Sequence, residues 1–265
     1  MRKAGVRVLG IHGRRRKTMP RGVRLSVGDR PPWLREAKVI LLAVQDDELD
    51  PLVRAWIAGG GPGRGQVVLH LSGARGAQVL APLRRLGVST GGMHPLMTAM
   101  GQPRLDAINL GNATFALEGD ARAVTAARRL VRKLGAHAVV LRRGSRPVYH
   151  AGAVFAANYV VTMLATAEDL LVKAGFRRAA ARLALVPLTG AAFMNAARNG
   201  PARALTGPIM RGDADTVRLN LRALPPGARA LYRAAGTATL SLARLSGRLT
   251  AVKAAAIARA LAARP

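Results

Sequence analysis

The chain has 265 residues, of which 42 are Lys or Arg and 13 are Asp or Glu, so its formal net charge is +29. It contains no cysteine, which excludes disulfides, thiolate metal sites and cysteine nucleophiles. The basic residues are spread along the chain and aromatic residues are only 3% of it. The composition therefore argues against specific nucleic-acid binding, which relies on clustered cations and stacking rings.

The apolar run near the amino terminus, residues 6–11, is too short for a secretion signal and is followed by arginines. The best candidate for a membrane span, residues 153–167, contains Asn158 and two threonines, and it falls short of the ~20 apolar residues that a span needs. We therefore expect a cytoplasmic protein that does not cross a membrane.

Strand and helix patterns alternate over the first 146 residues. Several strand candidates are continuous apolar runs, which are typical of parallel strands buried on both faces. The predicted strands are residues 6–12, 23–27, 38–45, 66–71, 88–93, 113–118 and 137–141, and the predicted helices are residues 47–58, 76–86 and 121–134. This alternation predicts an α/β sheet domain with helical crossovers.

The first predicted strand is followed by a glycine and a cluster of arginines. This pattern is typical of the second strand of a dinucleotide-binding fold, which ends near an adenosine phosphate. In that fold a first strand and a G-x-G-x-x-G turn precede it by about 25 residues. We therefore expect a Rossmann-like sheet that lacks its first strand, through a late start codon or true loss. The centre of the 3-2-1-4-5-6 strand order would then be vacant, leaving two strands with unpaired edges.

After residue 146 the strand patterns stop. Residues 149–173 are apolar nearly all round, as expected of a helix at the centre of a helical domain. Glycines and prolines separate the helices that are predicted to follow, at residues 177–198, 213–224, 227–245 and 249–263. We expect a truncated sheet domain of residues 1–146 and an all-helical domain of residues 147–265.

Three loops follow the carboxyl ends of predicted strands, where open α/β sheets bind ligands. The first loop contains Val44 and Asp46, the second contains Ser72 and Gly73, and the third is residues 91–95. Ser72 and the glycines beside it would let backbone N–H groups bind an anion at a helix N-terminus. The alternative is that Asp46 and Ser72 only cap helices.

Five segments together carry a family resemblance: AVQDDEL, HLSGARGAQVLAPLRRLG, GGMHPLMTAM, YHAGAVFAANYVV and LTGPIMRGD. In this order they resemble the bacterial two-domain Rossmann-like proteins of domain-of-unknown-function family 2520. Proteins related to that family in fold are F420-dependent NADP oxidoreductases, pyrroline-carboxylate reductases and β-hydroxyacid dehydrogenases. The resemblance implies an NAD(P)-binding domain, a helical domain that mediates homodimerisation, and a substrate cleft between them.

The resemblance favours an NADP-dependent oxidoreductase that transfers a hydride to or from a small carbonyl, hydroxy or imine substrate. The alternative is a noncatalytic dimerising or ligand-sensing module with the same fold. Gly13, Arg14 and Arg15 follow the second strand of the fold, where arginine suits the 2′-phosphate of NADP and an acid would suit NAD. No acid is present there, so we expect NADP, with NAD or a solvated basic loop as the alternatives.

In dehydrogenases of similar fold a titratable residue and an Asn of the first long helix face the nicotinamide, which implies such roles for His150 and Asn158. His150 would act as the general acid, or else be a structural histidine at the domain boundary. His94, at the end of a strand, is the second candidate acid, whereas His70 lies in an apolar strand and is expected in the core.

Thr206 and Arg211 lie in a sharp break between two predicted helices and are candidate substrate-binding residues. Arg211 could hold a substrate carboxylate, although a solvated surface arginine explains it more simply. Asp213 is expected to cap the following helix. The histidines and acids show no metal-ligand spacing, so no metal site is predicted.

Overall fold

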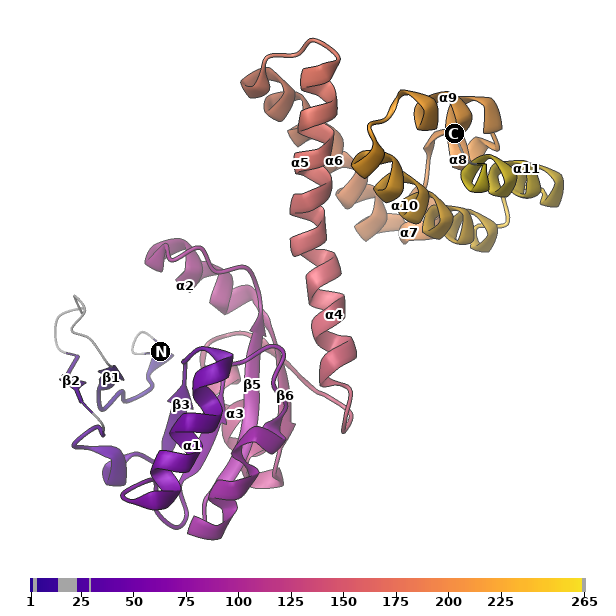
Figure 1. Ribbon diagram of the computed structural model, residues 1–265. Coiled ribbons are helices and arrows are strands. Elements are labelled where there is room, and N and C mark those ends of the chain that lie inside the picture. The colour runs from indigo at the N-terminus through magenta and orange to yellow at the C-terminus, as the bar shows by residue number, and fades with distance from the viewer. Residues whose placement is uncertain (2–3, 14–22, 29, 264–265) are drawn as a thin grey trace. The chain divides into compact units, whose positions relative to one another are not determined.

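The computed structural model describes residues 1, 4–13, 23–28 and 30–263 (Figure 1). It divides into two compact units, Met1–Tyr159 and Val160–Pro265. The strands that the structure describes all lie in the first unit, and the described part of the second unit is helical.

A five-stranded sheet in the order β3-β4-β5-β6-β7 forms the centre of the first unit. The strands are β3 (Val39–Leu42), β4 (Val67–His70), β5 (Ser89–Leu96), β6 (Thr114–Gly119) and β7 (His137–Val140). Neighbouring strands are parallel except for β5 and β6, which are antiparallel. This reversal was not predicted, and neither was α2 (Pro103–Asn112), which lies between the two strands in sequence.

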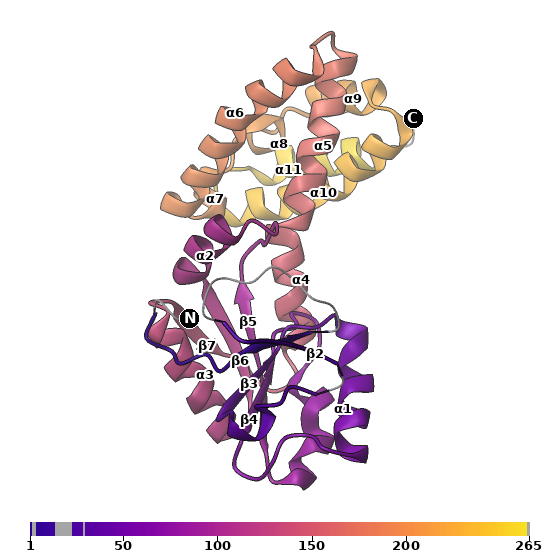
Figure 2. The ribbon, with the colours of Figure 1, turned by 90° about the vertical axis from the view of Figure 1, so that its left-hand side faces the viewer.

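Helices cover both faces of this sheet (Figure 1, Figure 2). On one face, α1 (Leu49–Ala58) and the 3₁₀ helix η4 (Ala77–Leu86) pack against Val68. On the other face, α3 (Ala121–Lys133) packs against Val67 and Leu69. Strand β4 is thus buried on both faces, which explains its continuous apolar sequence. Two further short 3₁₀ helices are η2 (Leu34–Glu36) and η3 (Asp46–Glu48).

Strands β1 (Ile11–Gly13) and β2 (Leu25–Val27) form a separate parallel pair. Among the described residues, no strand pairs with the second edge of β1 or with the outer edge of β3. If β2, β1 and β3 correspond to strands 3, 2 and 4 of the Rossmann order, the position between β1 and β3 belongs to strand 1.

The helices after the sheet are α4 (Arg146–Ala156), α5 (Asn158–Lys173), α6 (Arg178–Asn199), α7 (Pro201–Ala204), α8 (Gly207–Arg211), α9 (Ala214–Ala223), α10 (Pro226–Leu245) and α11 (Ala251–Ala262). The core of the second unit is formed by α8 to α11 around Val217 and Ile257. Asp213 caps α9 as predicted, because its carboxylate accepts hydrogen bonds from the backbone N–H of Thr216 at 3.0 Å and from its hydroxyl at 2.7 Å.

The helix predicted at residues 149–173 differs from expectation in two ways. It is divided after Ala156 into α4 and α5, and none of the described residues of α5 is buried. The expectation of a central core helix is therefore wrong for the single chain. The units also divide after Tyr159 and not after residue 146, because the first turn of α4 packs against the sheet.

Two helical segments reach the length and mean hydropathy of a membrane span: Arg146–Lys173, with a value of 1.3, and Arg178–Asn199, with 1.2. The expectation that the longest apolar stretch falls short of a membrane span is therefore wrong by length and composition alone. The first segment was missed because Asn158 and the threonines interrupt the apolar run, although the mean hydropathy of the helix stays at 1.3.

Candidate functional site

A cluster of polar side chains lies where the first turn of α4 meets the sheet. Arg146, Tyr149 and His150 occupy helix positions i, i+3 and i+4, so they share one face of α4. Opposite them lie residues of β4, β5 and β6. We call this set the polar cluster; its members are His70, His94, Glu118, Arg146, Tyr149 and His150.

Arg146 is anchored in the protein by Glu118. Its side chain is 2% exposed, and its Nε donates a hydrogen bond to Oε1 of Glu118 at 2.9 Å. The same oxygen accepts the backbone N–H of Ala77 at 2.8 Å. The N-terminus of η4, where an anion was expected to bind, is therefore bonded to a carboxylate of the chain itself. Nη1 and Nη2 of Arg146 are buried and have no hydrogen-bond partner in the described part of the chain.

His94 and Tyr149 form a hydrogen-bonded pair, with 2.7 Å between Nδ1 and the phenol oxygen. Burial, followed by the charge of Arg146 and by His150, lowers the pKa of His94 to about 4, while Asp46 opposes this shift. Burial also raises the pKa of Tyr149. Both groups are therefore uncharged at neutral pH, and the tautomer of His94 decides which of them donates the hydrogen bond.

His70 lies in the core, as predicted, but its hydrogen bonding is unusual. The ring is fully buried, and neither nitrogen has a hydrogen-bond partner that meets normal geometry among the described residues. Burial, with Arg146 as the second cause, lowers its pKa to about 4. A neutral imidazole thus lies beside a buried guanidinium.

Two glycines make room for the cluster. Residues His70, Gly92 and Glu118 lie side by side across β4, β5 and β6. A Cβ on Gly92 would lie 2.5 Å from Nη2 of Arg146 and 3.0 Å from Nε2 of His70. A Cβ on Gly73 would lie 2.8 Å from Nε2 of His94 and 3.0 Å from Nδ1 of His150. The absence of a side chain at these positions therefore allows the ring nitrogens and the guanidinium to converge.

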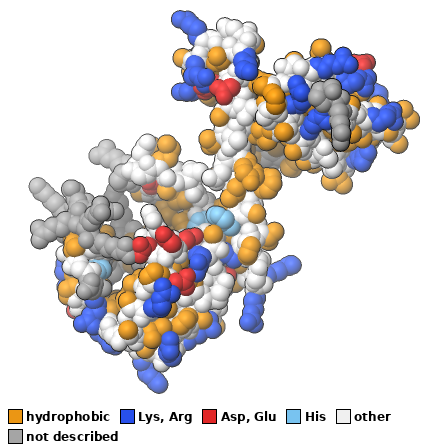
Figure 3. Space-filling view, in the orientation of Figure 1, with side chains coloured by type: hydrophobic (Ala, Val, Ile, Leu, Met, Phe, Trp, Pro, Cys, Tyr) orange, Lys and Arg blue, Asp and Glu red, His pale blue; other side chains and the backbone are white. Residues whose placement is uncertain are grey.

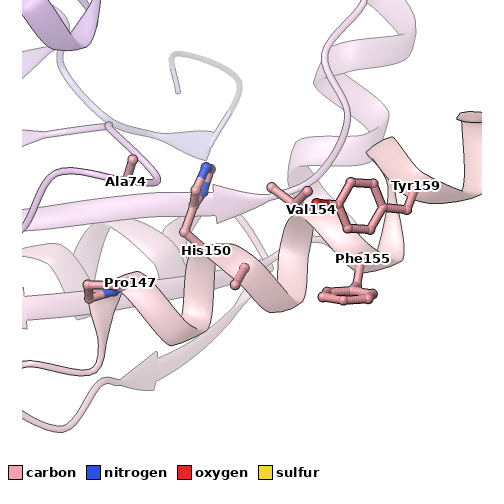
Figure 4. A pocket seen from close by; sticks show the side chains of 7 residues that line it. Ala74, Pro147, His150, Val154, Phe155 and Tyr159 are labelled. Carbon is pink, nitrogen blue, oxygen red and sulfur yellow. The ribbon is translucent and has the colours of Figure 1, made fainter. Parts of the chain in front are cut away.

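An open pocket of about 360 Å³ adjoins this cluster. His150 contributes to its wall, and Nδ1 of the ring is buried without a partner among the described residues. Figure 4 shows His150 near Ala74, and Phe155 next to Tyr159. The pocket is lined by Ala74, Pro147, His150, Ala151, Val154, Phe155 and Tyr159, all of which belong to the first unit.

The structure brings His94 and His150 together on either side of Gly73. Asn158 begins α5 and is not one of the residues that line the pocket. Asp46 lies close enough to His70 and His94 for its charge to oppose, in part, the lowering of the pKa of each ring. The polar cluster therefore includes both predicted histidines, with Asp46 nearby.

The remaining candidates have more ordinary surroundings. Ser72 Oγ accepts the backbone N–H of Arg75 at 2.9 Å in the loop ahead of η4, whose N-cap is Gly76, and Val44 is exposed. Thr206 and Arg211 lie in the second unit, where Arg211 is 65% exposed and 4.0 Å from Asp213. Gly13 ends β1. Arg14 and Arg15 lie outside the described residues.

Sequence reasoning missed Arg146, Tyr149 and Glu118. The spacing of Arg146, Tyr149 and His150 at the start of an apolar helix was the available signal, because it places three polar groups on one face. In the described part of the chain, no group of three or more His, Asp or Glu side chains is arranged to hold a metal ion.

Two family models match the chain in order: a Rossmann-like domain at residues 11–95 and a domain of unknown function, DUF2520, at residues 113–239. The fold and these matches define a Rossmann-like α/β protein with a helical carboxy-terminal region. The helical part of the chain is thus similar to DUF2520 proteins, and the part before it is similar to Rossmann-like domains. No curated protein matches its sequence.

Solved structures share this fold at low identity. The protein TM1727 from Thermotoga maritima is 19% identical with a TM-score of 0.66, and the match covers 83% of each chain. The candidate NADP oxidoreductase BF3122 from Bacteroides fragilis is 20% identical with a TM-score of 0.68, covering 91% of this chain and 90% of that one. Pyrroline carboxylate reductase from Plasmodium falciparum, solved with NADP bound, is 13% identical with a TM-score of 0.52, covering 98% and 91%.

The described residues fit NADP in part. Loops that follow β3 and β4 carry Asp46, Ser72 and Gly73 at the carboxyl edge of parallel strands, where this fold holds dinucleotides. However, no described strand lies between β1 and β3, so the glycine turn that would bind the pyrophosphate is not among the described residues. The fit is therefore limited to the part of the site beside the polar cluster.

Proposed function

We propose that the protein is an NADP-dependent oxidoreductase that acts on a small carbonyl, hydroxy or imine substrate, with NAD as the alternative cofactor. The observation that carries the proposal is the convergence of His94 and His150 beside an open pocket. The shared fold with an NADP-bound pyrroline carboxylate reductase supports the choice of cofactor. Arg14 and Arg15 follow β1 in sequence and are the proposed partners of the 2′-phosphate.

The cofactor, when bound, supplies the hydride. His150 exchanges a proton with the substrate oxygen or nitrogen through Nε2, since Nδ1 is buried. His94 and Tyr149 lie next to His150 in the polar cluster and form an uncharged hydrogen-bonded pair. Arg146, held by Glu118, positions the turn of α4 that carries His150.

The second candidate function is a noncatalytic ligand-sensing module. It is favoured by the apolar lining of the pocket, in which His150 and the Tyr159 hydroxyl are the polar side-chain groups. Such a module would bind a ligand in the pocket without oxidising NADPH.

We also propose that two copies associate through the apolar surface of α5 and α6. Large apolar residues of both helices are exposed; they include Val161, Met163, Leu183, Val186, Leu188 and Phe193. Exposed apolar surface of this extent is typical of an interaction site. A membrane span fits α5 less well, because Glu168, Asp169 and Lys173 lie in its last turns.

The catalytic proposal is tested with His150→Gln, which removes a proton donor without opening a cavity. NADPH oxidation would be followed spectrophotometrically with a panel of carbonyl and imine substrates, with His137→Gln on β7 as the matched control. We expect loss of turnover in His150→Gln alone, with a melting temperature within a few degrees of wild type. Full activity per folded molecule would remove His150 from the mechanism and leave His94 as the candidate acid. Binding of NADPH without oxidation of any substrate would favour the sensing module.

A further inference from the structure

We infer that the pocket on α4 binds the uncharged body of an aromatic or alicyclic carbonyl or imine compound and discriminates against compounds that carry a carboxylate. For turnover, this inference rests on the proposed function; for binding, it stands on the pocket itself. It concerns the apolar wall and the charges around the pocket.

The wall of the pocket is apolar apart from two groups. His150 and the Tyr159 hydroxyl are the polar side-chain groups among the residues that line it. Phe155 and Tyr159 meet edge to face, with ring centroids 4.9 Å apart and an interplanar angle of 83°. These rings, with Val154, form an apolar corner to which a flat or alicyclic body can pack (Figure 4). The volume of about 360 Å³ lies within the range typical of small-molecule sites, roughly 300–1,000 Å³.

The charges around the pocket exclude a carboxylate anchor. The chain has 42 Lys and Arg residues, and blue basic side chains are spread over both units in Figure 3, yet none lines the pocket among the described residues. Arg146 is not available, because its Nε is bonded to Glu118 and both Nη atoms are buried. A carboxylate entering the pocket would lose hydration without gaining an ion pair. A neutral carbonyl needs only one hydrogen bond, which His150 can donate.

The test compares acetophenone with phenylglyoxylate, which share a phenyl ring and a ketone but differ by a carboxylate. Binding to the full chain is measured without cofactor by saturation-transfer NMR and titration. We expect acetophenone to bind at least tenfold more tightly than phenylglyoxylate. Failure of acetophenone to bind, or equal or tighter binding of phenylglyoxylate, would overturn the inference. Binding of acetophenone with no oxidation of NADPH by any compound of the carbonyl and imine panel would overturn the proposed function and leave this inference intact.

Substitutions of Val154 locate the effect in the pocket. Val154→Arg places a guanidinium in the apolar corner and should reverse the preference in favour of phenylglyoxylate. The matched control is Val148→Arg, on the same helix but outside the lining, where Val148 is 72% exposed. Val154→Phe fills the corner and should weaken acetophenone binding at least fivefold, and it serves as the test if Val154→Arg does not fold. If Val154→Arg binds both compounds as Val148→Arg does, and Val154→Phe binds acetophenone as the wild type does, the pocket is not the site.

Discussion

Glu118 neutralises Arg146 inside the first unit through a single oxygen that lies 2.9 Å from Nε of the arginine. The two side chains are 2% and 12% exposed, so water screens this ion pair little. The same oxygen accepts the N–H of Ala77. One carboxylate therefore joins the first turn of α4, strand β6 and the start of η4, and it fixes the helix that presents Tyr149 and His150.

Glu118→Ala should destabilise the first unit strongly. It leaves the buried charge of Arg146 without a partner, for which a loss of about 3–5 kcal/mol in the free energy of unfolding is expected. Urea unfolding followed by circular dichroism measures this loss. The control Asp215→Asn breaks the exposed ion pair with Arg218 and should cost less than about 1 kcal/mol. Similar losses in the two variants would contradict a buried role for Glu118.

His70 should make the protein less stable in mild acid. Burial lowers the pKa of its ring from 6.5 to about 4. Between these values the unfolded chain binds the proton and the folded chain does not, so stability is full above pH 6.5 and falls as the pH decreases. At pH 5 the loss from this group is about 2 kcal/mol. His70→Leu should remove that part of the loss in urea unfolding at pH 7.5 and pH 5. A pH dependence of stability identical to that of the wild type would show that His70 does not cause the loss in acid.

Tyr149→Phe should change the state of His94 with little effect on the fold. The variant removes the hydroxyl that lies 2.7 Å from Nδ1 of His94, and the cost of such a hydrogen bond is about 1 kcal/mol. Nitrogen-15 NMR of the histidine rings should show a changed tautomer population at His94. Tyr159→Phe provides the matched control, because it removes a hydroxyl from the same helical segment. An unchanged His94 spectrum in Tyr149→Phe would exclude a positioning role for Tyr149.

A parallel strand placed between β1 and β3 should join the two sheets. Fusing an apolar strand, a G-x-G-x-x-G turn and a crossover helix ahead of Met1 would supply partners for both unpaired edges and a site for the pyrophosphate. We expect a higher melting temperature and NADPH binding by calorimetry.

In the fused protein, replacing Arg14 and Arg15 together with Ala should weaken NADPH binding far more than NADH binding, because only NADPH carries the 2′-phosphate. An equal loss for the two cofactors would remove these arginines from cofactor selection.

Charged substitutions on α6 should prevent association. Leu183→Glu combined with Val186→Glu places two charges on the exposed apolar surface and should convert a dimer to a monomer in light scattering. Leu219→Glu, at an exposed position of α9 in the same unit, should leave the dimer intact. A monomeric wild-type protein would contradict the dimer proposal, and partition into detergent would favour a membrane role for these helices.

The elements of the fold were predictable where side-chain patterns determine them. The apolar run of β4 indicates a strand buried on two faces, and the buried positions of α3 recur every four residues at Ala123, Ala127 and Val131. Helix α2 was missed because its large apolar residues, Leu105 and Ile108, are exposed and form no buried stripe. The antiparallel direction of β6 was missed because strand patterns do not encode direction.

The histidines of the site could be found from the sequence, but their partners could not. His94 and His150 occupy the ends of elements that face the ligand-binding edge in related folds. Glu118 and Arg146 look like surface residues in a chain rich in arginine, and their pairing joins positions 28 residues apart. The strand register places Glu118 beside Gly92 and His70, and the packing of α4 on the sheet brings Arg146 to Glu118. Both depend on tertiary structure.

Gly73 and Gly92 should limit sequence variation among related chains, because imidazole nitrogens approach the first and a guanidinium approaches the second. Any side chain at residue 73 would collide with His94 and His150, and any side chain at residue 92 would collide with Arg146 and His70. Each glycine should therefore vary only together with the polar residues it accommodates. Such paired changes would mark chains that have given up the chemistry of this cluster while keeping the fold.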